Sequence, residues 1–281
     1  MPELPEVQTT VQGLQILLSK KITNIKIYSR KLRYEIPKNI QKIFKNGKII
    51  AIYRIGKYIV VDSKNHYSLI FHLGMSGRLR ILKPSKFVKK KHDHFILETK
   101  KYILIFNDVR RFGFIDLLKT EKIFKKNYIS LLGIDALDTK LNEKYLESKI
   151  YKSIVPIKQI LLNQRIIAGI GNIYANEILY DAKISPFIKG SSLKIIEIKK
   201  IIKSIKKILK MAINSGGSTL RDYTSADGKV GNFQNNFKVY NRDGLKILGY
   251  KIKRVIQYGR ATFYCPDIQL ISKKIEKRSK A

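Results

Sequence analysis

The chain has 281 residues, of which 44% are hydrophobic, so it can form one large or two medium-sized domains and is not wholly disordered. Its formal net charge is +36, from 57 lysines and arginines against 21 carboxylates, which favours a polyanionic partner, most simply nucleic acid. The single cysteine, Cys265, excludes an intramolecular disulfide and a cysteine zinc cluster, and no apolar run is long enough to span a membrane.

The size of the charge has a second explanation. Of the basic residues, 44 are lysine, and lysine and the equally abundant isoleucine both have A/T-rich codons. The sign of the charge and the shortage of carboxylates are therefore better guides than its size. The residues after Pro2 do not read as a secretory signal, which, with a single cysteine, is typical of a cytoplasmic protein.

The first residues, Met1-Pro2-Glu3-Leu4-Pro5-Glu6, carry the most specific chemistry. Because Pro2 is small, we expect Met1 to be removed, which leaves proline with a free secondary amine. Such an amine is a nucleophile that can form a Schiff base. A terminal amine has a pKa of about 8, against about 10.4 for lysine, so more of it is unprotonated at neutral pH. The resulting iminium has no N–H to lose and remains a cationic electron sink.

Residues 7–19 are expected to form an amphipathic helix with Val7, Val11, Leu14 and Leu18 on one face. From Lys21 to about Leu118 the chain is rich in β-formers, broken by Gly, Asn, Asp and Lys. Short strands at this spacing predict a sandwich or a barrel. The expected strands are 49–53, 58–61, 67–73, 95–98 and 102–106.

After Leu118 the pattern becomes helical. Residues 119–150 are expected to be a connection with short helices, and a long helix is predicted from Leu193 to Ala212 with Ser192 as its N-cap. The outer face of that helix is rich in lysine, and a core helix with a solvated basic face is favoured over a membrane-surface helix. Residues 216–237 are Gly- and Ser-rich and predict a loop, and 250–256 and 261–265 predict a hairpin.

Eight short islands, read in order, resemble the formamidopyrimidine-DNA glycosylase family from Pro2 to about Cys265. They begin at Pro2, Gly56, His72, Lys91, Arg110, Gly169, Ala226 and Arg260. The resemblance implies an α+β multi-domain fold, an N-terminal β-sandwich with a leading helix followed by a helix–two-turn–helix domain that ends in a β-hairpin. The expected boundaries are a catalytic sandwich domain at 1–134, a linker at 135–150, a DNA-binding helical domain at 151–235 with a lesion loop at 216–237, a finger hairpin at 236–272, and a frayed tail at 273–281.

The resemblance also implies the catalytic roles. Pro2 attacks C1′ of a damaged deoxynucleotide, Glu3 exchanges protons with the sugar, and Glu6 supports them from the same pocket. Lys57 serves the first elimination and Arg260 the second. Because arginine does not readily give up a proton, we interpret Arg260 as a clamp on the leaving phosphate. The alternative for Glu3 and Glu6 is a pair of acids that stabilise a helix N-terminus, and for Lys57 one more surface lysine.

Chemistry on a stacked base requires its extrusion from the duplex. The resemblance implies that Met75, Arg110 and Phe112 fill the void, although sequence alone places Met75 and Phe112 in a core. The family resemblance also implies that His92 contacts DNA. His92 and His94 are spaced to share one strand face and could bind a metal ion, but two ligands are too few for a metal site. Asn172 is expected to cap the helix starting at Ile173 and leave backbone N–H groups for a phosphate, with Lys152 and Lys158 nearby. Ser153 stands where many relatives have a basic residue.

The carboxyl end departs from the family. Relatives carry a zinc finger with two Cys-x-x-Cys pairs, whereas here Leu245-Lys246-Ile247-Leu248 stands in the region of the first pair and only Cys265 remains of the second. We therefore expect no zinc and no other cofactor. The finger is predicted to be held by packing of Ile252, Ile256 and Phe263, and because an isolated hairpin is marginally stable, it must pack on the helical domain.

The favoured hypothesis is a bifunctional DNA glycosylase and abasic-site lyase for oxidised purines, which uses an iminium of Pro2 and β,δ-elimination. Leu4 and the run Arg110-Arg111-Phe112 favour it over the endonuclease VIII branch, which prefers oxidised pyrimidines. Two further hypotheses compete with it: a DNA-binding relative that has lost catalysis, and a general basic nucleoid protein. The expected partner is damaged duplex DNA, with no membrane, and a monomer working at the nucleoid.

Overall fold

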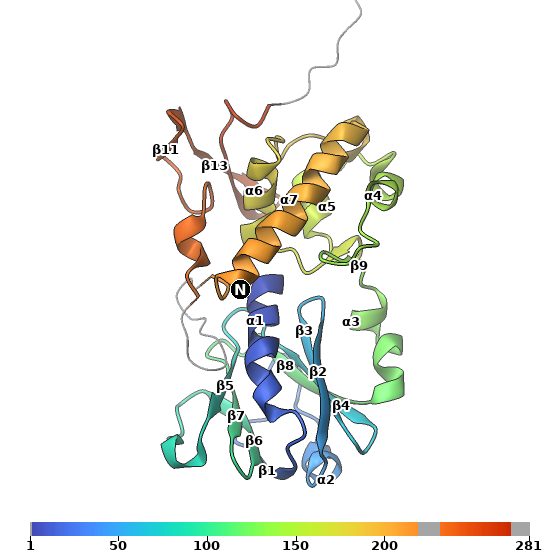
Figure 1. Ribbon diagram of the computed structural model, residues 1–281, viewed down its shortest axis with the longest axis vertical. Helices are drawn as coiled ribbons and strands as arrows, with labels where there is room; N and C mark the ends of the chain where they lie inside the picture. The colour runs from blue at the N-terminus through green and yellow to red at the C-terminus, as the bar shows by residue number, and fades with distance from the viewer. Residues whose placement is uncertain (1, 219–230, 271–281) are drawn as a thin grey trace, which may run out of the picture.

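The computed structural model of the protein describes residues 2–218 and 231–270, with a β-rich part below and a helical part above it in the view of Figure 1. The β-rich part contains two four-stranded antiparallel sheets. The first has the order β1 (Ile22–Ile27), β6 (Asp93–Thr99), β7 (Ile103–Asn107) and β5 (Arg78–Leu82), and the second the order β2 (Ile49–Ile55), β3 (Tyr58–Ser63), β4 (Tyr67–His72) and β8 (Phe114–Lys119).

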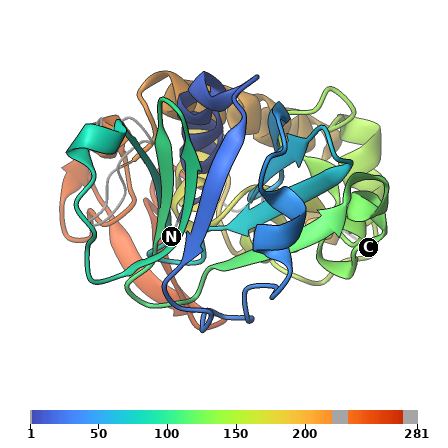
Figure 2. The same cartoon turned by 90° about the horizontal axis from the view of Figure 1, so that it is seen from below.

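The two sheets face each other across an apolar core, which confirms the predicted sandwich (Figure 2). Alternate residues of each strand point inward, as the pleat requires. Phe71 of β4 meets Phe95 of β6 and Phe106 of β7 across the core, with ring centroids 5.9 and 6.1 Å apart. The short helix α2 (Ile40–Phe44) contributes Ile40 and Phe44 to the same core.

The leading helix α1 (Leu4–Leu14) begins three residues earlier than predicted and ends in a 3₁₀ turn at Gln15–Leu17. The early start follows from a capping box, in which the backbone N–H of Glu3 donates to the Glu6 carboxylate at 2.9 Å. Leu4 packs in the core of the helical part, whereas Val7 and Leu14 pack in the sandwich. Helix α1 therefore joins the two cores and fixes the amino terminus between them (Figure 1).

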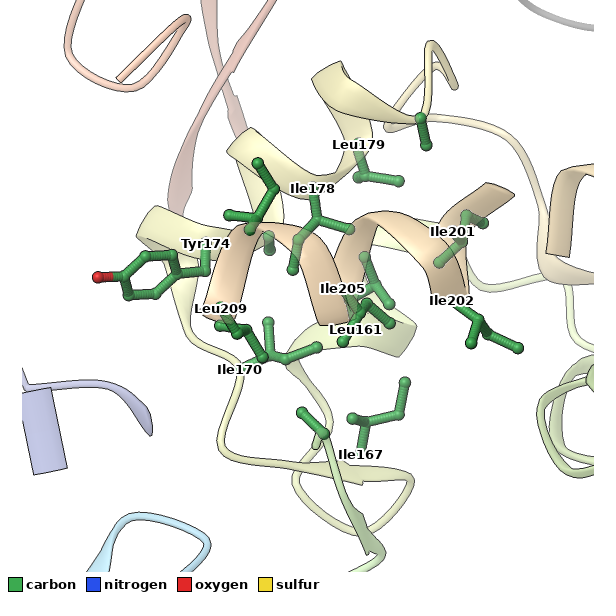
Figure 3. Packing of buried hydrophobic residues seen from close by; sticks show 14 of the residues in the cluster. Leu161, Ile167, Ile170, Tyr174, Ile178, Leu179, Ile201, Ile202, Ile205 and Leu209 are labelled. Atoms are coloured by element: carbon green, nitrogen blue, oxygen red, sulfur yellow. The ribbon is translucent and has the colours of Figure 1, made fainter. Parts of the chain in front are cut away.

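The helical part is built around α7 (Ile195–Asn214), which packs against α6 (Asn172–Asp181) and α4 (Glu143–Ile150), with α5 (Ile157–Leu162) beside α6. Isoleucines and leucines of these helices interdigitate, and Tyr174 lies at the edge of the cluster with its hydroxyl directed out of it (Figure 3). Helix α7 begins at Ile195, after the predicted cap Ser192, because the N–H of Lys194 donates to Glu197 at 2.8 Å. The remaining short helices are 3₁₀ turns at 84–86, 120–125, 190–192 and 233–236, and α3 (Asn127–Ser130).

The segment predicted as a linker, 135–150, is instead folded into the helical part. Leu141, Leu146 and Ile150 are buried in its core. The strand β9 (Ile134–Asp135) pairs in parallel with β10 (Ile167–Ala168), which precedes α6. The sequence prediction failed because the apolar residues of this segment are few and their partners lie far along the chain. Within the described residues, no helix is long and apolar enough to cross a membrane.

The carboxyl-terminal part contains two small hairpins, β11 (Lys246–Ile247) with β12 (Tyr250–Lys251), and β13 (Lys253–Gln257) with β14 (Arg260–Tyr264). The second is the predicted hairpin, and it turns at Tyr258-Gly259, both with positive φ. Ile252 and Phe263 are buried beside Val239, as expected. Ile256 was placed in this cluster wrongly: it is 62% exposed, because it shares with Arg254 the solvent face of β13.

A buried carboxylate of α6 anchors the segment that leads into these hairpins. Glu177 accepts the backbone N–H groups of Lys238, Val239 and Tyr240 at 2.8–2.9 Å. Burial raises the pKa of Glu177, and the three N–H groups oppose that rise.

We expect Glu177→Ala to lower the free energy of unfolding by about 1–3 kcal/mol, since three buried donors lose their acceptor. Hydrogen exchange should rise first at residues 238–240. Urea denaturation and exchange measurements check this, with the exposed Glu147→Ala on α4 as the control. Equal behaviour of the two variants would contradict the anchoring role.

Candidate active site and nucleic-acid interface

The Glu3 carboxylate is bound to the start of a distant helix. It accepts the backbone N–H groups of Gly171 and Ile173 at 2.8 Å and of Tyr174 at 3.3 Å. Gly171 has no side chain where one would collide, since a Cβ there would lie 2.3 Å from Cδ of Glu3. The N-cap residue of α6 is Gly171, so the prediction that Asn172 caps this helix is wrong by one position. Glu3 occupies N–H groups that were expected to await a phosphate.

The ionisation of Glu3 is tuned by opposing effects. Burial raises the pKa of Glu3 most strongly, and the negative charge of Glu6 raises it further. The positive charge of Lys57 and the N–H groups of Ile173 and Tyr174 lower it. A carboxyl with a raised pKa can exchange protons with a substrate closer to neutral pH than an exposed glutamate can.

Glu6 lies in the same buried pocket and gathers three segments of the chain. Its carboxylate accepts the Glu3 N–H at 2.9 Å, the Tyr174 hydroxyl at 2.6 Å, and both the N–H and the hydroxyl of Ser218 at 2.8 and 2.9 Å. Ser218 is the last described residue before 219–230, so most of the lesion loop predicted at 216–237 lies outside the described residues. Glu6 therefore connects the start of α1, helix α6 and the segment that follows α7.

Lys57 enters the site from the turn between β2 and β3. Its Nζ donates to the carbonyl of Ile170 at 2.8 Å. Burial lowers the pKa of Lys57, and Arg260 lowers it further, while Glu3 raises it. The turn is braced by Arg54, which donates to the Asp135 carboxylate with two nitrogens, at 2.5 and 3.0 Å, and to Gln8 at 2.9 Å. A surface-lysine role for Lys57 does not fit this position.

Arg260 is exposed at the first position of β14, and the residues beside it are held from the helical part. Lys158 is fully buried and donates to the Ala261 carbonyl at 2.9 Å and the Thr262 hydroxyl at 2.8 Å. Burial lowers the pKa of Lys158 to about 8, with a contribution from Arg260. Lys158 was predicted to contact DNA, but in this arrangement its ammonium group supports the hairpin and has no solvent-facing surface.

Asn172 also supports the hairpin, because its Nδ2 donates to the Ala261 carbonyl at 3.0 Å. Two predicted contacts lie at the surface. Lys152 is exposed, with its ammonium group 5.6 Å from the centre of the Tyr151 ring. His92 is partly exposed, whereas its neighbour His94 is buried, with Nε2 2.8 Å from the Asp108 carbonyl oxygen. Ser153 Oγ accepts the N–H of Val155 at 3.3 Å.

The residues predicted to fill the void lie on two loops that are fastened together. The Ser76 hydroxyl donates to Asp108 at 2.5 Å and accepts the Arg110 N–H at 3.0 Å. Met75 and Phe112 are 43% and 45% exposed, so they project from the loops and are not core residues. The Arg110 guanidinium lies over the Phe112 ring, 4.6 Å from its centre. Met75, Phe112 and Arg110 therefore form an exposed apolar and cationic ridge on these loops.

Two side chains of this site were not singled out from the sequence. Tyr174 donates to Glu6 as described, and His72 accepts the Gly74 N–H at Nδ1 at 3.2 Å, next to Met75. Burial lowers the pKa of His72 to about 4, and the charges of Lys57 and Arg33 lower it too. His72 is therefore neutral at physiological pH. Both residues stand inside motifs used for the family resemblance, but their contacts depend on residues far away in sequence.

Two family models match the chain. The formamidopyrimidine-DNA glycosylase N-terminal domain matches residues 1–115, and the formamidopyrimidine-DNA glycosylase H2TH domain matches residues 132–224. The formamidopyrimidine-DNA glycosylase of Zymomonas mobilis is 44% identical over 272 residues, which are 96% of this chain and all of that protein. The chain belongs to the formamidopyrimidine-DNA glycosylase family. This membership confirms the family resemblance and the fold class predicted from the sequence.

Further members of the formamidopyrimidine-DNA glycosylase family are similar to this chain over nearly its whole length. The enzyme of Rickettsia felis is 42% identical over 273 residues, 96% of this chain and 98% of that protein. A solved complex of a Lactococcus lactis enzyme variant with DNA containing Fapy-dG has a TM-score of 0.89 at 33% identity, covering 95% of this chain and 99% of that one. A complex of the Lactococcus lactis enzyme with DNA containing an abasic site has a TM-score of 0.88 at 33% identity and the same coverage.

The residues of the finger do not fit the zinc ion that formamidopyrimidine-DNA glycosylases were expected to carry there. Cys265 is the chain's one cysteine and is buried, with its N–H bonded to Gln269 at 2.8 Å. Across residues 2–218 and 231–270, no group of three His, Cys, Asp or Glu side chains could hold a metal. The apolar cluster of Val239, Ile252 and Phe263 stabilises the finger instead.

We expect the purified protein to contain no stoichiometric zinc, and a chelator such as EDTA to leave its activity and melting temperature unchanged. Elemental analysis by plasma mass spectrometry and activity before and after dialysis against the chelator check this. A relative with four finger cysteines is the positive control. Loss of activity that added zinc restores would contradict the prediction.

Proposed function

We propose that this protein is a bifunctional DNA glycosylase and abasic-site lyase of base excision repair that removes oxidised purines from duplex DNA. The observation that carries the proposal is the convergence of the buried Glu3 and Glu6 and the half-buried Lys57 on the segment that begins with Pro2. An amine, a carboxyl of raised pKa and a lysine of lowered pKa are the groups that Schiff-base chemistry on a sugar needs.

In the proposed reaction the Pro2 nitrogen attacks C1′ of the damaged nucleotide. The bond between C1′ and the base breaks, and the base leaves with the electron pair and takes up a proton. Glu3 exchanges protons with the sugar oxygen as the ring opens, which leaves the iminium between Pro2 and C1′. The iminium acidifies C2′, so loss of a C2′ proton expels the 3′-phosphate, and a second elimination expels the 5′-phosphate.

The contacts around Pro2 support this division of roles. Lys57 has a lowered pKa and lies close enough to influence the ionisation of Glu3, so it suits proton transfer in the first elimination. Arg260, exposed on a strand that Lys158 and Asn172 hold, suits a clamp on the leaving phosphate. Met75, Arg110 and Phe112 project as a ridge that suits the space left by an extruded nucleotide.

The preference for oxidised purines rests on the relatives. The solved complexes of the Lactococcus lactis enzyme include DNA containing Fapy-dG, an abasic site and an oxidised pyrimidine. We further propose that the protein acts as a monomer at the nucleoid, where its substrate lies.

The deciding experiment is borohydride trapping with a protein whose first residue is Pro2. Four duplexes are compared in single turnover. They contain 8-oxoguanine, a formamidopyrimidine, an oxidised pyrimidine or no damage. We expect covalent adducts on the damaged duplexes, fastest with the oxidised purines, and none on the undamaged one. Tight binding of a damaged duplex with no adduct and no strand cleavage would show a relative that has lost catalysis.

A further inference from the structure

The outer face of α7 carries a group of lysines that the proposed reaction does not use. Between residues 199 and 210 this helix has six lysines and no carboxylate. The one acid of α7, Glu197, accepts the N–H of Lys194 at the start of the helix. We call this group the lysine face; it consists of Lys199, Lys200, Lys203, Lys206, Lys207 and Lys210, all exposed except the half-buried Lys206.

Little of the charge of the lysine face is compensated by carboxylates of residues 2–218 and 231–270. Among the described residues, its one ion pair joins Lys207 to Asp181 at 2.6 Å. Lys199 and Lys203, Lys203 and Lys207, and Lys206 and Lys210 are spaced four residues apart, where like charges repel and weaken a helix. Helix α7 tolerates this because its opposite face is buried in the core. A polyanion bound across the face would remove the repulsion.

The carboxyl-terminal end of α7 packs near the amino terminus, and the helix runs from there away from the proposed reaction site (Figure 1). In Figure 2, α7 lies along the upper edge of the molecule, whereas the hairpin β13–β14, which carries Arg260, lies towards the opposite edge. The outer side of α7 and the hairpin therefore lie at different edges of the molecule.

A lipid surface fits this face poorly. Membrane-surface helices place apolar side chains in the bilayer boundary, but the apolar residues between 199 and 210, including Ile201, Ile205 and Leu209, are buried in the core. The lysines instead extend over about 16 Å at 1.5 Å per residue. Duplex DNA carries one charge per about 1.7 Å of its axis, so roughly nine phosphates lie within that span.

We propose that the lysine face of α7 is a second binding surface for duplex DNA, which holds an undamaged segment while the site at Pro2 engages another. Such a surface would let the enzyme pass between neighbouring duplex segments without release into solution. It gives part of the excess of lysine a function beyond genome composition.

The test compares the wild type with a variant in which Lys199, Lys203, Lys206 and Lys210 are all changed to Gln. The control has the same change at four exposed lysines around α2, at the far end of the sandwich: Lys42, Lys45, Lys48 and Lys64. The number of undamaged 12-base-pair duplexes bound per chain is measured by sedimentation at low salt. A bead-bound duplex is also used to capture a second, fluorescent duplex through the protein.

We expect two duplexes per chain and capture of the second duplex for the wild type and the control, and one duplex without capture for the α7 variant. The slope of log K against log salt concentration for the second duplex should fall in magnitude by up to about 3.6, which is about 0.9 for each of four lost phosphate contacts. Excision of a lesion from a short duplex should stay within about twofold, which separates this proposal from the proposed function. The proposal of a second DNA surface would be overturned if the α7 variant bound two duplexes or if the wild type bound only one. It would also be overturned if the lysines bound phosphatidylglycerol vesicles in place of DNA.

Discussion

A protein in which Met1, or any added residue, remains in front of Pro2 is expected to bind damaged duplex but to form no covalent adduct with it. An amide nitrogen has no available electron pair, so it cannot attack C1′. Loss of a catalytic nucleophile typically lowers kcat by about 10⁶, so excision and strand cleavage should both fall below detection. Binding should change little, because the residues proposed to contact DNA lie on other segments.

The experiment uses two proteins that differ only at the amino terminus. One is cut by a site-specific protease so that it begins with Pro2, and the other keeps Met-Ala before it. Single-turnover excision, borohydride trapping and anisotropy of a labelled duplex with a stable abasic analogue are measured on both. Pro2→Gly, which replaces the secondary terminal amine with a primary one, is the matched variant and should retain part of the trapping. Equal trapping by the blocked protein would point to a lysine as the nucleophile.

The amino-terminal residues show what the sequence could and could not predict about this site. The order Pro2-Glu3 and the family islands predicted which residues belong to one site, but not the contacts that hold them there. An acid at a helix start was expected either to act in catalysis or to stabilise its own helix, whereas Glu3 binds the N–H groups of Gly171 and Ile173 in α6. A contact over 168 residues depends on the packing of two domains, and no local pattern encodes it.

Ile256 illustrates the opposite error, in which local pattern suggested the wrong environment. Lys158 was predicted to contact DNA from its nearness in sequence to the motif at Gly169, and its partners Ala261 and Thr262 could not be foreseen because they are more than 100 residues away. Ile256 is apolar and lies in a strand, so it was predicted to be buried. Only the register of the hairpin shows that it shares the exposed face with Arg254.

The sandwich was easier to predict because its signals are local. Each predicted strand is a short run of β-formers set off by Gly, Asn, Asp or Lys, so the strands 58–61 and 67–73 nearly coincide with β3 and β4. Met75 and Phe112 could not be assigned in this way, since an exposed apolar residue on a loop looks like a core residue in sequence. The pairing of Ser76 with Asp108 is what turns them outward.

The second large effect is expected for Glu3→Gln, which should lower excision by about 10²–10⁴-fold because the group that exchanges protons with the sugar is lost. Its effect on stability should depend on pH. The pKa of Glu3 is raised in the folded protein, so folding favours the protonated carboxyl. The contribution of Glu3 to stability is therefore fully present below its unfolded pKa, near 4.5, and is lost as pH rises through the folded pKa.

Gln cannot ionise, so the difference in unfolding free energy between the wild type and Glu3→Gln should fall as pH rises from 4 towards 8. Urea denaturation at several pH values measures it. Lys57→Met provides the matched background: the charge of Lys57 lowers the pKa of Glu3, so without it the loss of stability should extend to higher pH. A difference that does not vary with pH would mean that the Glu3 pKa is ordinary. If Lys57→Met did not change the pH range over which this stability is lost, the charges of Lys57 and Glu3 would not interact. A carboxylate that acted only as a helix cap would have a lowered pKa, so its contribution to stability would rise with pH instead of falling. The sign of the pH dependence therefore separates a carboxyl of raised pKa from a purely capping one.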